Sequence, residues 1–254
     1  MRVRILGCGT SSGVPRIGND WGSCDPADPR NRRTRASIVV EDGGTCLLVD
    51  TSPDMRQQLL DAGLIGIDAI LWTHDHADHC HGIDDVRQIF HARGTPVPGY
   101  GFAETMDQLK QRFGYVFFGR DGYPPTIEDH VLEPDMAIGT IRIRHVMQPH
   151  GSIFSAGFRF DCAGKSIGYS TDFHAVTEEM SELFAGVDIW IVDALRVRPH
   201  PTHAHLALTL DAIGRCRPGR AILTHLDHSM DYAWLADRLP DGVEAGYDGL
   251  EIEP

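Results

Sequence analysis

The sequence lacks the paired cysteines of a redox motif or a zinc ribbon. No two of its cysteines form a CxxC pair; they are Cys8, Cys24, Cys46, Cys80, Cys162 and Cys216. Long apolar runs are also missing, because stretches such as IWIV at 189–192 fall far short of the roughly 20 residues of a membrane span. These absences favour reduced thiols in a cytoplasmic protein and argue against a membrane-spanning segment.

Basic residues are scarce as well. The chain has 23 Lys and Arg against 36 Asp and Glu, a formal net charge of −13 with neutral histidines. This balance argues against long nucleic acids as partners, because phosphate contacts need basic side chains. The opening MRVRILGCGT has no apolar run of the kind a signal peptide needs, so no export is expected. One basic stretch, 28–35, either binds a small anion or is a solvated loop; its arginines are Arg30, Arg32, Arg33 and Arg35.

The composition is that of a globular protein. Hydrophobic residues make up 42% and charged residues 23% of the 254 positions, and we expect one domain over 1–254. In the first half, branched runs at 37–41, 46–50 and 67–73 predict strands, and a one-sided apolar stripe predicts a helix at 53–63. This alternation indicates a layered α/β architecture.

The second half shows the same alternation of predicted strands and helices. Helices are predicted near 178–184 and at 206–216. Between the halves lies the segment 95–134, in which prolines and glycines are spread among aromatic residues. Because proline and glycine interrupt regular elements, we predict an irregular insertion there, which either roofs a pocket or packs against the body.

A concentration of metal-capable side chains occurs in WTHDHADHCHG, at 72–82. It follows the apolar ILW, so its histidines should begin where a buried strand ends, which is where layered α/β folds bind ligands. Neutral imidazole and carboxylate groups suit zinc, iron and manganese. A histidine-rich surface loop is the alternative, but four such groups, His74, His76, Asp78 and His79, within six residues favour a metal site.

The stretch THDHADH resembles the HxHxDH signature of metallo-β-lactamase-fold hydrolases. Three later residues match that family in order, each just after a predicted strand: His150 in QPHGS, Asp172 in YSTD and His225 in LTH. The resemblance implies a four-layer αββα sandwich with two divalent ions per chain, Zn²⁺ or Mn²⁺ being favoured. It assigns one ion to His74, His76 and His150, the other to Asp78, His79 and His225, and both to Asp172.

Other stretches narrow the resemblance to one branch. ILGCGTSSGVP, SPDMR, STDF and AILTHLDHSMDY resemble the phosphodiesterases that cleave phosphoribosyl 1,2-cyclic phosphate, within the wider ribonuclease Z-like group. This branch implies a small, cyclic or linear phosphodiester of a ribose phosphate or nucleotide as substrate, with a homodimer as a common assembly. The lack of long apolar runs predicts no membrane partner. The long basic arm of ribonuclease Z is not visible in this chain.

Particular residues take their expected roles from this resemblance. His203 matches the histidine that gives a proton to the leaving oxygen, and a histidine suits that role near neutral pH. Asp78 is expected to be catalytic as well as a ligand, and Asp50 to orient the ligand loop. The expected reaction is attack on phosphorus by a hydroxide held between the metals. His200 and His205 are expected to be loop histidines.

The sequence departs from the resembled enzymes at one point, and several alternatives stay open. The resembled enzymes bind a structural zinc through a cysteine-rich cluster, of which only Cys24 and His228 remain, so we predict no structural zinc. The glycine-rich 7–13 is either an anion-binding loop or a tight turn. A thioester or lactone hydrolase on the same metals, and a non-catalytic metal- or nucleotide-binding module, are the competing functions.

Overall fold

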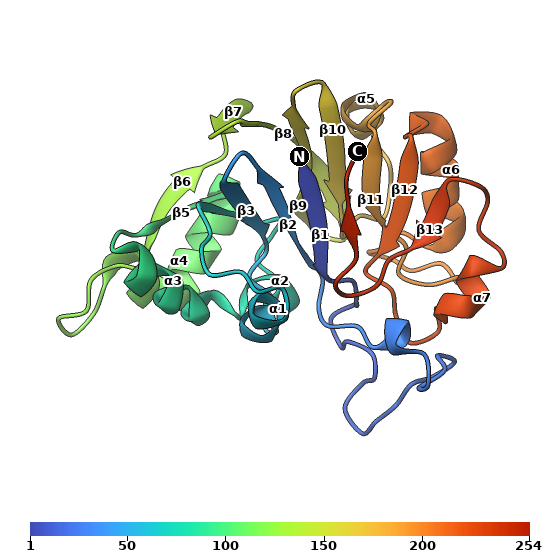
Figure 1. The fold of residues 1–254 in the computed structure, drawn as a ribbon, viewed down its shortest axis with the longest axis horizontal. Coiled ribbons are helices and arrows are strands. Elements are labelled where there is room, and N and C mark those ends of the chain that lie inside the picture. The colour runs from blue at the N-terminus through green and yellow to red at the C-terminus, as the bar shows by residue number, and fades with distance from the viewer.

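Two seven-stranded sheets form the centre of the molecule, as a computed structural model of residues 1–254 describes it (Figure 1). The first sheet has the order β14-β1-β2-β3-β4-β5-β6 and the second β13-β12-β11-β10-β9-β8-β7. The first comprises β1 (Arg2–Gly7), β2 (Ser37–Asp42), β3 (Thr45–Val49), β4 (Ala69–Leu71), β5 (Val97–Gly101), β6 (Ile127–Val131) and β14 (Glu251–Ile252). The second comprises β7 (Asp135–Ile138), β8 (Ile141–His150), β9 (Ile153–Cys162), β10 (Lys165–Ser170), β11 (Ile189–Asp193), β12 (Arg220–Thr224) and β13 (Val243–Ala245).

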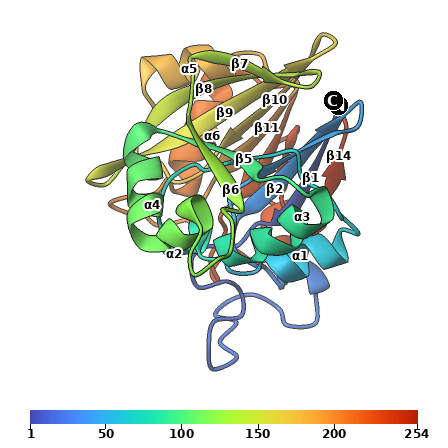
Figure 2. The same cartoon turned by 90° about the vertical axis from the view of Figure 1, so that its left-hand side faces the viewer.

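Helices cover the outer face of each sheet. Figure 2 shows α1 and α3 on one outer side and α5 and α6 on the other. The α-helices are α1 (Met55–Asp61), α2 (Ala77–Cys80), α3 (Val86–Arg93), α4 (Ala103–Phe118), α5 (Glu178–Phe184), α6 (Leu206–Cys216) and α7 (Tyr232–Ala236). Two short 3-10 helices, η1 (Pro29–Asn31) and η2 (Ile83–Asp85), complete the elements.

Three apolar clusters separate the layers. The central one joins the inner faces of both sheets, with fully buried Ile38 and Leu47 from the first and Phe158 and Ile191 from the second. A second cluster packs the first sheet against α1, α3 and α4, and a third packs the second sheet against α5 and α6. The expected αββα sandwich is therefore confirmed, because alternate residues of each strand face a different apolar layer.

The two sheets share a plan that positions the site. Strands β3 to β6 run parallel in the first sheet, and β10 to β13 run parallel in the second. The remaining pairs are antiparallel. Since parallel strands end at the same edge, residues that follow β3, β4, β10, β11 and β12 are brought to corresponding edges of the sandwich.

The segment 95–134 is not the irregular insertion that its prolines and glycines predicted. It forms β5, the long helix α4 and β6, which extend the first sheet and cover its outer face. Gly99 is required for packing, because a Cβ there would lie 2.5 Å from the ring of Trp72. Here glycine allows a close approach of an indole to a strand instead of ending it.

Other predicted elements match the structure closely. The helices expected at 178–184 and 206–216 are α5 and α6, and α1 lies inside the predicted 53–63. The side chain of Thr177 accepts a hydrogen bond from Met180 N at 3.2 Å, which caps the start of α5. No helix in the structure combines the length and apolarity needed to cross a bilayer.

Candidate metal centre

The stretch 72–79 after β4, called the ligand loop below, is anchored to the end of β3 by Asp50. Thr73 donates to this carboxylate through its backbone N–H at 2.8 Å and through its hydroxyl at 2.8 Å and 3.0 Å. The Nδ1–H of His79 donates to Asp50 Oδ2 at 2.7 Å. The ring of His79 is therefore fixed at Nδ1, which leaves the lone pair of Nε2 available to a metal ion. Asp50 thus has the orienting position that the family resemblance predicted.

Three site residues have a backbone conformation that is uncommon for residues other than glycine. Asp50, Asp172 and His225, which follow β3, β10 and β12, have φ values of 65°, 57° and 58°. This left-handed conformation costs energy for a residue with a Cβ and is concentrated at functional sites. At each of these three strand ends the main chain therefore turns sharply.

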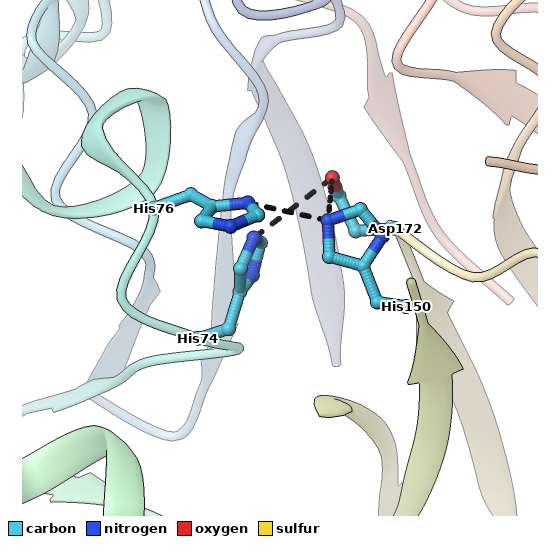
Figure 3. Close-up of side chains that lie close together, drawn as sticks. All are labelled: His74, His76, His150 and Asp172. Atoms are coloured by element: carbon cyan, nitrogen blue, oxygen red, sulfur yellow. Dashed lines mark hydrogen bonds and ion pairs between the residues drawn. The ribbon is translucent and has the colours of Figure 1, made fainter. Parts of the chain in front are cut away.

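A first group of donor atoms comes together from both sheets (Figure 3). His74 and His76 extend from the ligand loop toward His150, at the end of β8, and toward Asp172. Asp172 Oδ1 lies 3.9 Å from His74 Nε2 and 3.5 Å from His150 Nε2. His150 Nε2 lies 3.2 Å from His76 Nδ1. The four residues each offer one donor atom, and these atoms all lie within 4.8 Å of one another.

A second group lies on the other side of Asp172. Its Oδ2 is 3.2 Å from His79 Nε2 and 3.6 Å from His225 Nε2. Asp78 Oδ2 completes this group, at 3.4 Å from His79 Nε2 and 3.6 Å from His225 Nε2. The two oxygens of Asp172 therefore face two separate donor sets, which is the geometry of a carboxylate that bridges two sites. The structure brings all seven residues together that the sequence predicted as ligands.

These donors fit a metal ion. The Nε2 atoms of His74, His79 and His225 are buried and have no hydrogen-bond partner, although buried polar atoms are normally paired. Imidazole and carboxylate donors about 2.0–2.1 Å from one tetrahedral ion lie about 3.3 Å apart. The observed separations of 3.2–3.9 Å around Asp172 are close to that value.

The electrostatics of the cluster also favour a bound cation. Burial holds the pKa of His74 well below its usual range, so this imidazole is neutral, which is the form that can bind a metal ion. Burial also opposes the charged form of His79, yet the carboxylates of Asp172, Asp78 and Asp50 outweigh it and raise its pKa well above the usual value. A field that stabilises positive charge in a buried space is the field that a divalent ion requires.

A cleft of about 440 Å³ opens onto the cluster, and His203 lies in its wall. His203 Nδ1 is 3.3 Å from Asp193 Oδ2 and 3.4 Å from Asp172 Oδ1, and the side chain is 14% exposed. With Nδ1 held by Asp193, the opposite ring nitrogen forms no hydrogen bond to the protein. His203 also forms a third donor group with Asp172 and His225.

Three supporting residues were not found from the sequence. Asp193 ends β11 and orients His203, while its Oδ2 also accepts a hydrogen bond from Asp172 N at 3.1 Å. The carbonyl of Thr202 accepts a 2.7 Å hydrogen bond from His150 Nδ1, and Thr73 anchors the loop as described. Asp193 had a usable signal, since IWIVD ends a buried strand in an aspartate just as LLVD does at Asp50.

The remaining candidates lie outside the donor groups. Arg30 pairs with Asp28, Arg35 pairs with Asp54, and the buried Arg33 donates to the carbonyls of Met230 and Asp227. The guanidinium of Arg32 lies 5.2 Å from the ring centre of Trp21. None of these four arginines lines the cleft, whose wall contains Ser11 of the glycine-rich loop.

The other histidines and Cys24 take separate positions. The ring of His200 is 5.1 Å from that of His203, and its Nδ1 is hydrogen-bonded to Thr202. His205 directly precedes α6, and His228 packs against Gly22. Cys24 Sγ lies 3.9 Å from Arg33 Nη1.

Comparison with known proteins agrees with this geometry. An octanoyltransferase of Porphyromonas gingivalis is 33% identical over 99% of this chain, which spans only 51% of that protein. A coenzyme PQQ synthesis protein B of Methylobacterium radiotolerans is 35% identical over 99% of both chains. The crystal structure of a diphosphatase from the PhnP family matches with a TM-score of 0.90 and 36% identity, over 99% of this chain and 97% of the other.

The family profile described as the beta-lactamase superfamily domain matches residues 45–226, well over half of the chain. That match includes both donor groups in full, from His74 to His225. The resemblance drawn from the HxHxDH signature is therefore confirmed. The chain belongs to the β-lactamase superfamily and has the fold of its metal-dependent hydrolases.

Proposed function

We propose that this chain is a dinuclear phosphodiesterase that hydrolyses a small phosphodiester of a ribose phosphate or nucleotide. The observation that carries the proposal is the position of His203, which lines the cleft beside Asp172, is oriented by Asp193 and leaves one ring nitrogen without a hydrogen bond. A site that only stored metal would need closed coordination and no oriented proton donor. The similarity to a diphosphatase of the PhnP family further supports chemistry at phosphorus.

The two donor groups would hold two divalent ions, with Zn²⁺ or Mn²⁺ suited to imidazole and carboxylate ligands. Such ions supply Lewis-acid chemistry, which acidifies a water molecule and offsets the charge that develops on phosphoryl oxygens. Asp172 keeps the two donor groups in a fixed relation because its oxygens face both. Thr202 and Asp50 fix the rings of His150 and His79 at Nδ1, so that their Nε2 atoms remain available.

His203 would complete the reaction by giving a proton to the leaving oxygen. The carboxylate of Asp193 accepts from Nδ1, which orients the ring for proton transfer. The transferred proton would therefore be carried by the opposite ring nitrogen, which forms no hydrogen bond to the protein. As the leaving oxygen becomes an alcohol, the ring becomes neutral and keeps its hydrogen bond to Asp193.

Turnover of bis(p-nitrophenyl) phosphate by protein loaded with Zn²⁺ or Mn²⁺ tests this function, measured beside thioester and lactone panels. We expect the phosphodiester to be the preferred substrate. His203→Ala should lower kcat by about 10²–10⁴-fold with metal content unchanged. His205→Ala is the matched control, because this neighbouring histidine lies outside every donor group.

Two results would contradict the proposal. Faster turnover of thioesters or lactones than of phosphodiesters would assign the site to the competing hydrolase function. Loss of metal from His203→Ala would make this residue a ligand through the group that it forms with Asp172 and His225, and would remove it as the proton donor.

A further inference from the structure

His76 is the least supported histidine of the metal centre. The other histidine ligands are buried, whereas His76 is exposed at the edge of the first donor group. Its ring has one hydrogen-bond contact, to His150 Nε2 at 3.2 Å, which is itself a donor atom of that group (Figure 3). An exposed side chain loses more conformational freedom on binding an ion than one that packing already holds. A fixed main chain at His76 would reduce that loss.

Asp50 anchors the ligand loop near its two ends and does not reach its middle. It accepts hydrogen bonds from Thr73 and from His79. Asp75 and His76, which lie between these two anchor points, form no hydrogen bond with it. The middle of the ligand loop therefore depends on a contact from another part of the molecule.

Arg112 of α4 provides this contact. Its Nη2 donates to the backbone carbonyl of Asp75 and to Asp75 Oδ2. The thiol of Cys80 donates to the same carbonyl at 3.3 Å. This carbonyl belongs to the peptide bond that joins Asp75 to His76, and a peptide bond is planar. Fixing its oxygen therefore restricts the main chain from which the ring of His76 extends.

A kink in α4 accompanies a second contact with the same part of the chain. Phe113 has a φ of −122° and a ψ of 33°, which are not helical values. Successive side chains of a regular helix point about 100° apart, so two consecutive residues rarely face one neighbour. Here the ring of Phe113 lies 5.6 Å from that of His81, directly after α2. Arg112 and Phe113 therefore contact the chain on both sides of His76.

We propose that Arg112 is a positioning residue for the ion of the first donor group, because it holds the peptide between Asp75 and His76 so that His76 is directed at that ion. This inference rests on the two-ion site of the proposed function and adds to it a residue from the segment 95–134. Hydrogen bonds from a charged donor are stronger than neutral ones, and outer partners of metal ligands contribute about 10–100-fold to affinity. The hydrogen bonds of Arg112 all go to Asp75, so the second donor group should not depend on it.

Competition for metal tests the proposal without any substrate. A chromogenic chelator titrated into the Zn²⁺-loaded protein gives a dissociation constant for each of the two ions. We expect Arg112→Gln to weaken the binding of one ion by about tenfold and to leave the other at its wild-type value. Arg112→Lys keeps a charged donor for Asp75, so this variant should recover most of the lost affinity.

A double-mutant cycle with His76 shows which ligand Arg112 acts through. His76→Ala removes the side chain that Arg112 is proposed to position. Adding Arg112→Gln to His76→Ala should therefore cause no further loss of metal affinity. A loss of about tenfold that persists in the His76→Ala background would overturn the proposal, because Arg112 would then act on the fold in general and not on this ligand.

Arg87→Gln is the matched control for the loss of one charge and one surface ion pair. Arg87 lies on α3 and pairs with Asp84 at 2.9 Å, so both metal affinities should stay at their wild-type values. Thermal unfolding of each variant checks that the fold is retained.

The same measurements separate the role of Arg112 from the proposed function. If both dissociation constants of Arg112→Gln match those of the wild-type protein, the role of Arg112 is refuted, whether or not bis(p-nitrophenyl) phosphate is cleaved. The expected change in affinity with no cleavage of any phosphodiester would instead refute the phosphodiesterase and leave the role of Arg112 supported.

Discussion

The two sheets contribute to the metal centre in different ways. The first sheet provides four donors from one six-residue stretch after β4, 74–79, held by a single carboxylate at the end of β3. The second sheet provides three donors, one at the end of β8 and one each after β10 and β12; they are His150, Asp172 and His225. The first set depends on local chain geometry, whereas the second depends on the register of buried strands.

This difference separates two ways of building a site. In the ligand loop, donor spacing follows from a few consecutive residues, at little cost in chain entropy. In the second sheet, Ser170 pairs with Val192 and Asp193 pairs with Thr224, so the donors are placed by the packing of buried strands. Substitutions that loosen the ligand loop should therefore change the orientation of its donors. Substitutions of the three donors from the second sheet should change how the two donor groups are held together.

Removing the bridging residue should have the largest effect. Asp172→Ala deletes the only carboxylate that faces both donor groups. Metal content should fall at both sites, and phosphodiester turnover should drop by more than the roughly 10–100-fold that loss of an outer partner causes. Elemental analysis and kcat measure both, with Asp211→Asn on the exposed face of α6 as control. Full metal content in Asp172→Ala would show that the two sheets hold metal independently.

The second-largest effect is expected when the ligand loop loses its anchor at Asp50. Asp50→Asn removes the charge that accepts from His79 Nδ1 and Thr73. We expect metal affinity to fall by about 10–100-fold, because the ring of His79 loses its orienting carboxylate. Competition with a chromogenic chelator gives the dissociation constants, and Asp61→Asn at the end of α1 is the control. Unchanged affinity would mean that the loop orients its donors without its anchor.

A smaller effect is expected from the corresponding residue of the second sheet. Asp193→Asn weakens the contact to His203 Nδ1 at 3.3 Å, while the amide oxygen can still accept from Asp172 N. The kcat for bis(p-nitrophenyl) phosphate should fall about tenfold, the effect of one charge-assisted hydrogen bond, with metal affinity nearly unchanged. If metal affinity fell as far as in Asp50→Asn, Asp193 would orient ligands instead of the proton donor.

The smallest effect concerns the junction where the chain returns from the second sheet to the first. Asp248 accepts from Cys8 N at 3.0 Å and from Thr34 N at 2.7 Å, and burial raises the pKa of its carboxyl from 3.8 to about 6. The folded state therefore holds this proton at pH values where the unfolded chain releases it. Stability from this group is present below pH 3.8 and is lost as the pH rises through about 6.

Asp248→Asn should lack this dependence. Relative to the variant, the wild-type protein should lose stability between pH 4 and pH 6 and then stay level. Urea unfolding at a series of pH values measures the difference, with the exposed Asp241→Asn as reference. If the wild-type protein instead gained stability relative to Asp248→Asn as the pH rises from 4 to 6, the assignment would be wrong.

How much of the site could be predicted from the sequence differs between the ligand loop of the first sheet and the strand ends of the second. The loop donors were visible as a pattern, whereas His150, Asp172 and His225 were found only through a family resemblance, because nothing local places three distant strand ends together. Asp193 was missed since a single aspartate after a strand is also typical of an ordinary cap. In the fold, α5 and α6 were predicted within their observed bounds.

The segment 95–134 was mispredicted for a physical reason. Its glycines and prolines indicated loops, but Gly99 gives room to the Trp72 ring, and residues of α4 such as Leu109 and Val116 join the buried layer beneath the helix. Tertiary packing thus outweighs the local preference for a break. A glycine that accommodates a neighbour and a glycine that ends a strand have the same sequence signal.

The left-handed corners at Asp50, Asp172 and His225 limit how this centre can change or be copied. Glycine at such a corner would relax the backbone but delete the donor, and a β-branched residue would resist the corner itself. Glutamate would keep a carboxylate on a longer arm and shift its oxygens. A protein engineer who transplants the cluster to a new scaffold must therefore reproduce three bends of the main chain together with the side chains.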